Sequence, residues 1–164
     1  MVMSQSNTKL SKKRIACFAS SQLAILKKRN LLKGVFIMNY GFIGLGNMAS
    51  AIIKGMCQSS VFPPDTIFGL NRSSDKTVKL ASTYGISACD TTEQLVAASD
   101  VIILAVKPNM LESVLQTMAP LIREQQLIIS IAAGKPLSFY AQFLPNNTVI
   151  RVMPNINAMV GAST

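Results

Sequence analysis

Histidine and tryptophan are absent from the 164 residues of this chain, and acidic residues are scarce. Without histidine, a Ser-His-Asp triad and a histidine general base are excluded, because both need an imidazole. Cys17, Cys57 and Cys89 form no even set and no Cys-x-x-Cys pair, which excludes a disulfide framework and a zinc site. We therefore assign no metal site, and any chemistry must use other side chains or a cofactor.

Long apolar runs are also missing from the sequence. None approaches the roughly 20 residues that a helix needs to span a bilayer, so we expect no membrane partner. Apolar residues still make up 49% of the chain and charged residues only 14%, which argues against a disordered protein. The length fits one domain of ordinary size with a substantial core.

The positive charge of the chain is concentrated at its N-terminus. The whole sequence has 16 basic and 7 acidic residues, a net charge of +9. Residues 1–37 contain eight of the basic residues and none of the acidic ones, so residues 38–164 are nearly neutral. Because that larger part has no basic stripe to follow a phosphate backbone, we expect no nucleic-acid partner for it.

Residues 1–37 form a basic N-terminal extension that has several interpretations. A targeting peptide, a nucleic-acid-binding arm, a disordered arm and a basic amphipathic helix near residues 19–32 all fit its composition. We favour an upstream mis-start, with Met38 as the native start, because the first expected strand follows Met38 closely. Lys33-Gly34-Val35 can also be encoded by a purine-rich sequence that resembles a bacterial ribosome-binding site.

Residues 38–164 alternate between short apolar runs and helical spacing. Runs typical of buried strands lie at 40–43, 66–70, 86–88, 101–106, 127–131 and 148–152. Helical patterns lie between them, one with apolar residues at 49, 52, 53 and 56, one at 75–84 with Gly85 as its C-cap, and one at 111–122 with Pro108 at its start. This alternation predicts an α/β fold, a doubly wound and mainly parallel sheet with helices on both faces.

A glycine-rich motif follows the first expected strand directly. It reads Gly44-Leu45-Gly46-Asn47-Met48-Ala49, after Ile43, and opens the first expected helix. Gly44 permits a tight turn, Gly46 lets the backbone approach a pyrophosphate, and the helix N-terminus offers free N–H groups. In this strand–turn–helix context the motif predicts a Rossmann-type dinucleotide site rather than a plain glycine turn.

The end of the second expected strand indicates which dinucleotide binds. An NAD site usually has Asp or Glu here to accept a hydrogen bond from the ribose 2′-hydroxyl. This chain instead has Asn71-Arg72-Ser73, and its next carboxylate is Asp75. A guanidinium beside hydroxyl groups suits a 2′-phosphate, so we predict NADPH rather than NADH, the alternative being that Arg72 is a solvated loop charge.

Two further strand ends are expected at the same edge of the sheet. Ala105-Val106-Lys107-Pro108 closes one, and Ala132-Ala133-Gly134 follows Ser130-Ile131 at the other. Ligands of open α/β sheets bind at this edge, so Lys107 is a candidate contact to the ribose or nicotinamide, unless it is only a solvated charge. The small residues at 132–134 leave room for a nicotinamide ring, although they are also good turn formers.

These strings together resemble the N-terminal domain of pyrroline-5-carboxylate reductase over residues 38–164. The resemblance is carried by residues 41–49, 71–73, 105–108 and 130–134 and by Arg151-Val152-Met153-Pro154-Asn155. It implies NADPH-dependent reduction of 1-pyrroline-5-carboxylate to L-proline in the cytoplasm. The cofactor phosphates would lie on residues 43–48, the adenosine end on 71–73, and the nicotinamide near 105–108 and 132–134.

The chain also departs from the pattern of that family. The family commonly reads Asn-Thr-Pro-Ala after Met-Pro, whereas this chain reads Asn155-Ile156-Asn157-Ala158. The resemblance further implies a helical C-terminal domain that forms a homo-oligomer and supplies substrate contacts, and that domain is not among these residues. We therefore assign no catalytic residue.

Other functions remain open for this sequence. A 3-hydroxyacid dehydrogenase shares the glycine-rich start and an Asn-Arg loop, but the strings at 105–108 and 151–155 argue against it. A non-catalytic NADP-binding module would need only the cofactor motifs. Nucleic-acid binding depends entirely on residues 1–37.

Overall fold

The computed structural model describes residues 37–59 and 61–154. The chain divides into two units, Met1–Ile37 and Met38–Thr164, and every element below belongs to the second. The interpretations of the N-terminal extension, including Cys17 and the helix near 19–32, lie outside the described residues. The same holds for the variant motif Asn155-Ile156-Asn157-Ala158, while the extent of the domain itself stays a prediction.

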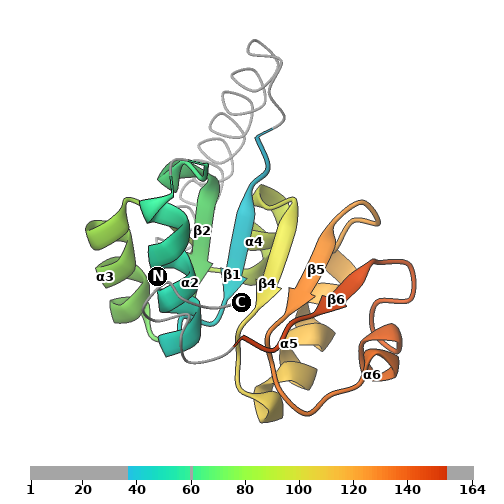
Figure 1. Ribbon diagram of the computed structural model, residues 1–164. Helices are drawn as coiled ribbons and strands as arrows, with labels where there is room; N and C mark the ends of the chain where they lie inside the picture. Colours follow the sequence, from blue (N-terminus) through green and yellow to red (C-terminus); the bar gives the residue numbers. More distant parts are fainter. Residues whose placement is uncertain (1–36, 60, 155–164) are drawn as a thin grey trace, which may run out of the picture. The chain divides into compact units, whose positions relative to one another are not determined.

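A six-stranded parallel sheet forms the centre of the second unit, in the order β3-β2-β1-β4-β5-β6 (Figure 1). This order confirms the predicted doubly wound sheet, and the strand order reverses between β1 and β4. The strands are β1 (Tyr40–Ile43), β2 (Ile67–Leu70), β3 (Ser87–Ala88), β4 (Val101–Leu104), β5 (Leu127–Ser130) and β6 (Val149–Arg151).

Several strands are shorter than their apolar runs predict. The run at 101–106 gives a strand only to Leu104, and the run at 148–152 gives one only over Val149–Arg151. Ala105 and Val106 are apolar, but they already belong to the connection that leaves the sheet at its carboxyl edge. An apolar run therefore indicates which residues are buried, but it does not indicate where the hydrogen-bonded strand ends.

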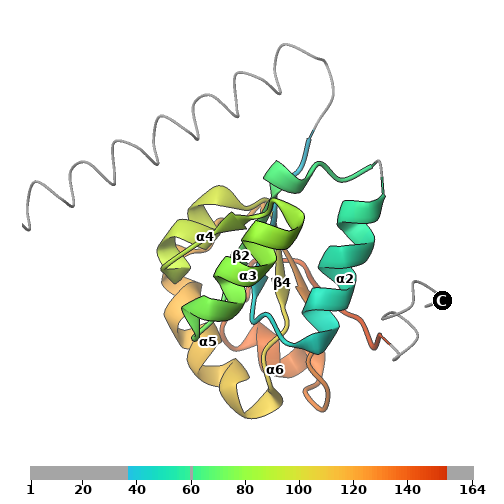
Figure 2. The ribbon, with the colours of Figure 1, turned by 90° about the vertical axis from the view of Figure 1, so that its left-hand side faces the viewer.

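Helices cover both faces of the sheet, as predicted. Figure 2 shows the sheet nearly edge-on, with α2 on one side and α4 and α5 on the other. The helices are α2 (Asn47–Gln58), α3 (Ser74–Tyr84), α4 (Thr92–Ala98), α5 (Leu111–Met118) and α6 (Leu137–Ala141), with short 3-10 helices η1 (Pro64–Thr66), η2 (Pro108–Met110) and η3 (Ala119–Leu121). Within the described ranges no helix is both long and apolar enough to cross a membrane.

Proline and glycine set the ends of three of these helices. The predicted C-cap of α3 is confirmed, because Gly85 has φ +73° and its N–H bonds to the Ala81 carbonyl at 2.9 Å. The helix predicted over 111–122 is instead α5 followed by η3, since Pro120 lacks the N–H that would continue the α-helix. Pro108 opens the 3-10 helix η2 and not α5 itself.

Helices α4 and α6 are absent from the expected pattern. Helix α4 has only seven residues, and Leu95 and Val96 are its buried pair, too few to establish a period. Its start was nevertheless readable, because Thr91 and Gln94 have capping-box spacing. The Thr91 side chain accepts a hydrogen bond from the Gln94 N–H, and the Gln94 side chain accepts one from the Asp90 N–H.

Apolar side chains from the two faces of the sheet form its core. On the α2 face, Phe42, Ile53, Ile67 and Val101 are almost completely buried. Alternate residues of β4 point the other way, and Ile102 and Leu104 are fully buried there together with Leu111, Leu115 and Met118 of α5. Met118 therefore fills part of this core.

Glycine in β1 brings α4 close to the sheet. A Cβ on Gly41 would overlap the Ser99 hydroxyl and lie 2.8 Å from Leu95 Cδ2. Any larger residue would push α4 away from β1.

Polar side chains close the amino edge of the sheet. Gln126, which is 2% exposed, donates from Nε2 to the Val96 and Ser99 carbonyls at 2.7 Å each. Its Oε1 accepts from the Arg123 N–H at 2.7 Å. Asn39 likewise donates to the Ala98 carbonyl. These bonds fix the turns that precede β4 and β5.

We expect Gln126→Ala to lower the free energy of unfolding by about 1–3 kcal/mol, because the Val96 carbonyl loses its side-chain donor and the Ser99 carbonyl keeps only Arg123. Gln125→Ala is the matched control, since Gln125 is exposed and is expected to change stability little. Urea denaturation of the full chain measures both. Equal stability of the two variants would show that this network does not hold the amino edge.

Candidate functional site

The ends of β1, β2 and β4 meet at the carboxyl edge of the sheet. The Gly44 N–H donates to the Leu70 carbonyl, and the Ala105 N–H donates to the Ile43 carbonyl, each at 2.9 Å. Gly44 has φ +93°, and a Cβ there would lie 2.7 Å from the Ala105 oxygen. Only glycine fits this turn, which therefore places three of the predicted site segments side by side.

Helix α2 begins at this edge with an open N-terminus. Gly46 is its N-cap residue, and no side chain caps the helix. The first N–H groups of a helix have no partner within it, so those of Asn47 and Met48 face outward from the helix end. A Cβ on Gly46 would meet no atom within 4 Å, so space for a ligand lies against the backbone. The arrangement is suited to an anion.

Asn71 ties the glycine-rich turn to the loop after β2. Its Oδ1 accepts a hydrogen bond from the Leu45 N–H at 3.1 Å, and its Nδ2 donates to the Ser73 carbonyl at 3.1 Å. We predicted Asn71 only as a cofactor contact. The structure shows that its amide also fixes the distance between the two loops, because both of its ends bond to backbone.

Arg72 and Ser73 are exposed on the loop that leads into α3. No ion pair or hydrogen bond of the Arg72 guanidinium is found among residues 37–59 and 61–154. Ser73 is the N-cap residue of α3, but its hydroxyl caps nothing. Both side chains are therefore available to an anion beside the glycine-rich turn.

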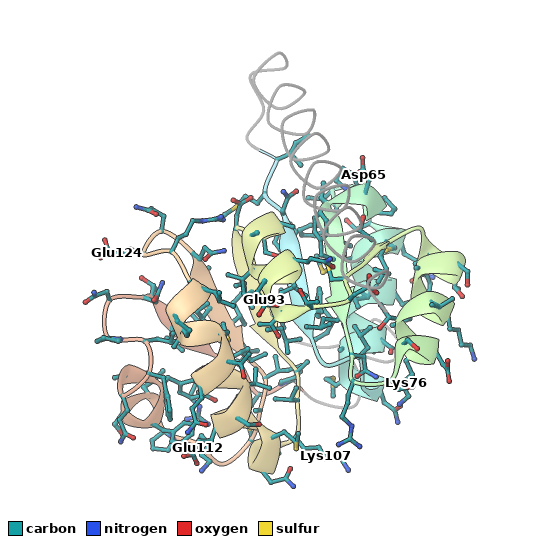
Figure 3. All side chains as sticks on the ribbon, turned by 180° about the vertical axis from the view of Figure 1, so that it is seen from behind. Asp65, Lys76, Glu93, Lys107, Glu112 and Glu124 are labelled. Atoms are coloured by element: carbon teal, nitrogen blue, oxygen red, sulfur yellow. The ribbon has the colours of Figure 1, made fainter. Side chains whose placement is uncertain are left out.

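Two more predicted segments reach the same edge. Ala105 and Val106 are half-buried beside Gly44, and Lys107 is exposed at the start of η2. Figure 3 shows the labelled side chains of Lys76 and Lys107 towards one end of the sheet, with Asp65 at the opposite end. Beyond β5, Ala132 is buried, whereas Ala133 and Gly134 are exposed.

The turn after β5 has a support that sequence patterns did not reveal. The Ser130 and Tyr140 hydroxyls lie 2.7 Å apart, and both residues are completely buried. Tyr140 comes from α6, which has only five residues and so gives no periodic signal. The sequence shows only a tyrosine ten residues after Ser130, and nothing in it indicates that the two hydroxyl groups meet.

Both cysteines of the described ranges are free thiols, Cys57 half-buried and Cys89 buried. Burial raises the pKa of the Cys57 thiol. Burial, followed by the neighbouring Asp90 carboxylate, raises the pKa of Cys89 to about 11. Both shifts favour the neutral thiol over the reactive thiolate. In the described part of the chain, no group of three or more histidine, cysteine, aspartate or glutamate residues is placed to hold a metal ion.

Comparison with known proteins gives a family match and close relatives. Residues 39–134 match the family described as NADP oxidoreductase coenzyme F420-dependent. A pyrroline-5-carboxylate reductase of Glycine max is 36% identical over 126 residues, which are 74% of this chain and 44% of the relative.

Solved structures of the same enzyme are also similar. The pyrroline-5-carboxylate reductase of Coxiella burnetii has a TM-score of 0.74 at 31% identity, covering 77% of this chain and 47% of that one. The Plasmodium falciparum pyrroline carboxylate reductase with NADP bound has a TM-score of 0.67 at 28% identity, covering 77% and 45%. The chain thus spans less than half the length of these relatives.

The family match and the sheet order agree with the dinucleotide site that the glycine-rich motif predicts. The similarity to pyrroline-5-carboxylate reductases also confirms the resemblance seen in the motifs. The chain belongs to the NADP oxidoreductase, coenzyme F420-dependent family, with pyrroline-5-carboxylate reductases among its relatives.

Proposed function

We propose that this chain binds NADPH along the carboxyl edge of its sheet. The phosphates would lie on Ile43, Gly44, Leu45, Gly46, Asn47 and Met48, at the open start of α2. Arg72 and Ser73, held by Asn71, would bind the 2′-phosphate of the adenosine ribose. The nicotinamide would lie between the segment of Ala105, Val106, Lys107 and Pro108 and that of Ala132, Ala133 and Gly134.

The single observation that carries this proposal is the open N-terminus of α2. Gly46 leaves space against the backbone, and no side chain caps the helix. A capping serine or aspartate would occupy the N–H groups that a pyrophosphate needs. The residues present therefore fit the dinucleotide.

The preference for NADPH over NADH rests on the end of β2. The position that usually carries a ribose-binding carboxylate is Asn71, whose Oδ1 already accepts from the Leu45 N–H. The exposed Arg72 lacks a partner among the described residues and offers a planar pair of donors. An anionic phosphate satisfies that guanidinium, whereas a hydroxyl group leaves its charge unpaired.

We further propose that the chain is the cofactor-binding part of a reductase of 1-pyrroline-5-carboxylate, acting in the cytoplasm as part of a homo-oligomer. The names of the relatives support this substrate. When bound, NADPH supplies the hydride that reduces the C=N bond to the amine of L-proline. The described residues hold and orient the cofactor, and we assign none of them as a proton donor.

The proposal keeps residues 38–164 as the domain that binds the cofactor and residues 1–37 as an extension outside it. The division of the chain into Met1–Ile37 and Met38–Thr164 supports this boundary. A non-catalytic NADP-binding role is the alternative, and it differs only in turnover.

The test of the function is NADPH oxidation by the purified full chain with 1-pyrroline-5-carboxylate. We expect tight NADPH binding but slow turnover, since we assign no proton donor among the described residues. Binding with no turnover at high protein concentration would favour the non-catalytic role. Absence of NADPH binding would contradict the proposal as a whole.

Arg72→Ala should weaken NADPH binding by about tenfold to hundredfold, because a charge-assisted contact to phosphate is lost. NADH binding should change by less than twofold. Lys79→Ala is the control, because Lys79 is an exposed cation farther along α3. Fluorescence titration with both cofactors measures the ratio, and an equal loss for NADPH and NADH would show that Arg72 does not read the 2′-phosphate.

Asn71→Asp should shift the cofactor preference towards NADH, whereas Asn71→Ala should weaken the binding of both cofactors. The aspartate keeps an acceptor for the Leu45 N–H but places a negative charge beside the 2′-phosphate, so NADPH binding should fall about tenfold relative to NADH. The alanine removes the tie between the loops. Fluorescence titrations with NADPH and NADH measure both variants. An unchanged ratio of the two affinities in Asn71→Asp would place the 2′-phosphate elsewhere.

A further inference from the structure

A buried pair of hydroxyl groups lies behind the turn that follows β5. Tyr140 Oη and Ser130 Oγ are 2.7 Å apart, and neither residue has any exposed surface. Ser130 is the last residue of β5, and Tyr140 is on α6, ten positions along the chain. The hydrogen bond therefore joins the end of β5 to α6.

Apolar residues surround this pair on the β4 side and beside the tyrosine ring. The register partner of Ser130 on β4 is Leu104, which is fully buried, and its partner on β6 is Arg151, which is exposed. The Tyr140 ring meets Phe139 edge-on, with the ring centroids 5.6 Å apart. A hydroxyl in such a place loses its water and must be paired within the protein, so each oxygen restricts the position of the other.

A second hydrogen bond links the hydroxyl pair to the backbone of the turn. Ser130 Oγ also accepts from the Ala132 N–H at 3.3 Å. The Ser130 carbonyl is held separately by the Val152 N–H at 2.9 Å, so the serine backbone is fixed by the sheet. The Ser130 side chain then sets the direction in which Ala132, and after it Ala133 and Gly134, leave the strand.

We infer that Tyr140 is a positioning residue that, through Ser130, holds the turn of residues 131–134 as a wall for the nicotinamide ring. This inference rests on the proposed function, since it takes that turn as the nicotinamide contact. Tyr140 touches no cofactor, because it is completely buried. Its effect passes through the serine hydroxyl and the Ala132 N–H.

A merely structural role for Tyr140 predicts something different. If its hydroxyl only stabilised the core, removal would lower stability and leave every ligand affected alike. If it positions the turn, removal should affect only ligands that carry a nicotinamide. Adenosine 2′,5′-bisphosphate contains the adenosine end and its phosphates without the nicotinamide, so it reports on the rest of the site.

The experiment measures binding of NADPH and of adenosine 2′,5′-bisphosphate to the full chain by calorimetry. We expect Tyr140→Phe to weaken NADPH about fivefold, the equivalent of one net hydrogen bond, and to leave the bisphosphate within twofold. Ser130→Ala should act in the same direction. Tyr84→Phe is the control, because Tyr84 is a half-buried tyrosine of α3 whose hydroxyl has no hydrogen-bond partner in the described ranges.

Other outcomes separate this inference from the proposed function. If the wild-type chain binds neither ligand, the proposed function itself fails, and the inference fails with it. If the wild-type chain binds both ligands but Tyr140→Phe weakens them equally or not at all, the inference is overturned while the cofactor site stands. Equal affinity of the wild-type chain for the two ligands also overturns it, because the turn then contributes nothing to binding.

Discussion

The contact of Gly44 with the backbone of Ala105 is the constraint on which the rest of the site depends. With φ +93° and a hypothetical Cβ only 2.7 Å from the Ala105 oxygen, this turn admits no side chain. It brings the end of β1 against the end of β4, at the point where the strand order of the sheet reverses. Helix α2 can then begin directly over that crevice, and the loops after β2 and β5 reach the same edge.

The two edges of the sheet differ in how their polar groups are satisfied. At the amino edge, Gln126, Asn39 and Arg123 donate hydrogen bonds to backbone carbonyls, so the polar groups of those turns are satisfied within the protein. At the carboxyl edge, the N-terminus of α2 has no cap, and Arg72 finds no partner in the part of the chain that the structure describes. One edge therefore provides stability, and the other keeps donors available for an anionic ligand.

Most of the fold was predictable because it depends on strong local signals. Buried runs of β-branched residues located the strands, and Gly85 and the glycine-rich motif located helix ends. The sequence did not predict α4 and α6, because helices of seven and five residues show no clear period. It also placed Asn71 and Ser130 at the correct strand ends without showing what they bond to. The hydrogen bonds of Asn71 to Leu45 and of Ser130 to Tyr140 join residues that are distant in the sequence and meet only in the folded structure.

Backbone amide resonances of the isotope-labelled full chain, recorded with and without NADPH, test the central claim most directly. The account predicts that the largest changes fall on residues 44–48, 71–74, 105–107 and 131–134, all at the carboxyl edge. The amides of Asn39, Arg123 and Gln126 at the amino edge should keep their positions. Changes centred on the amino edge, or none at saturating NADPH, would contradict it.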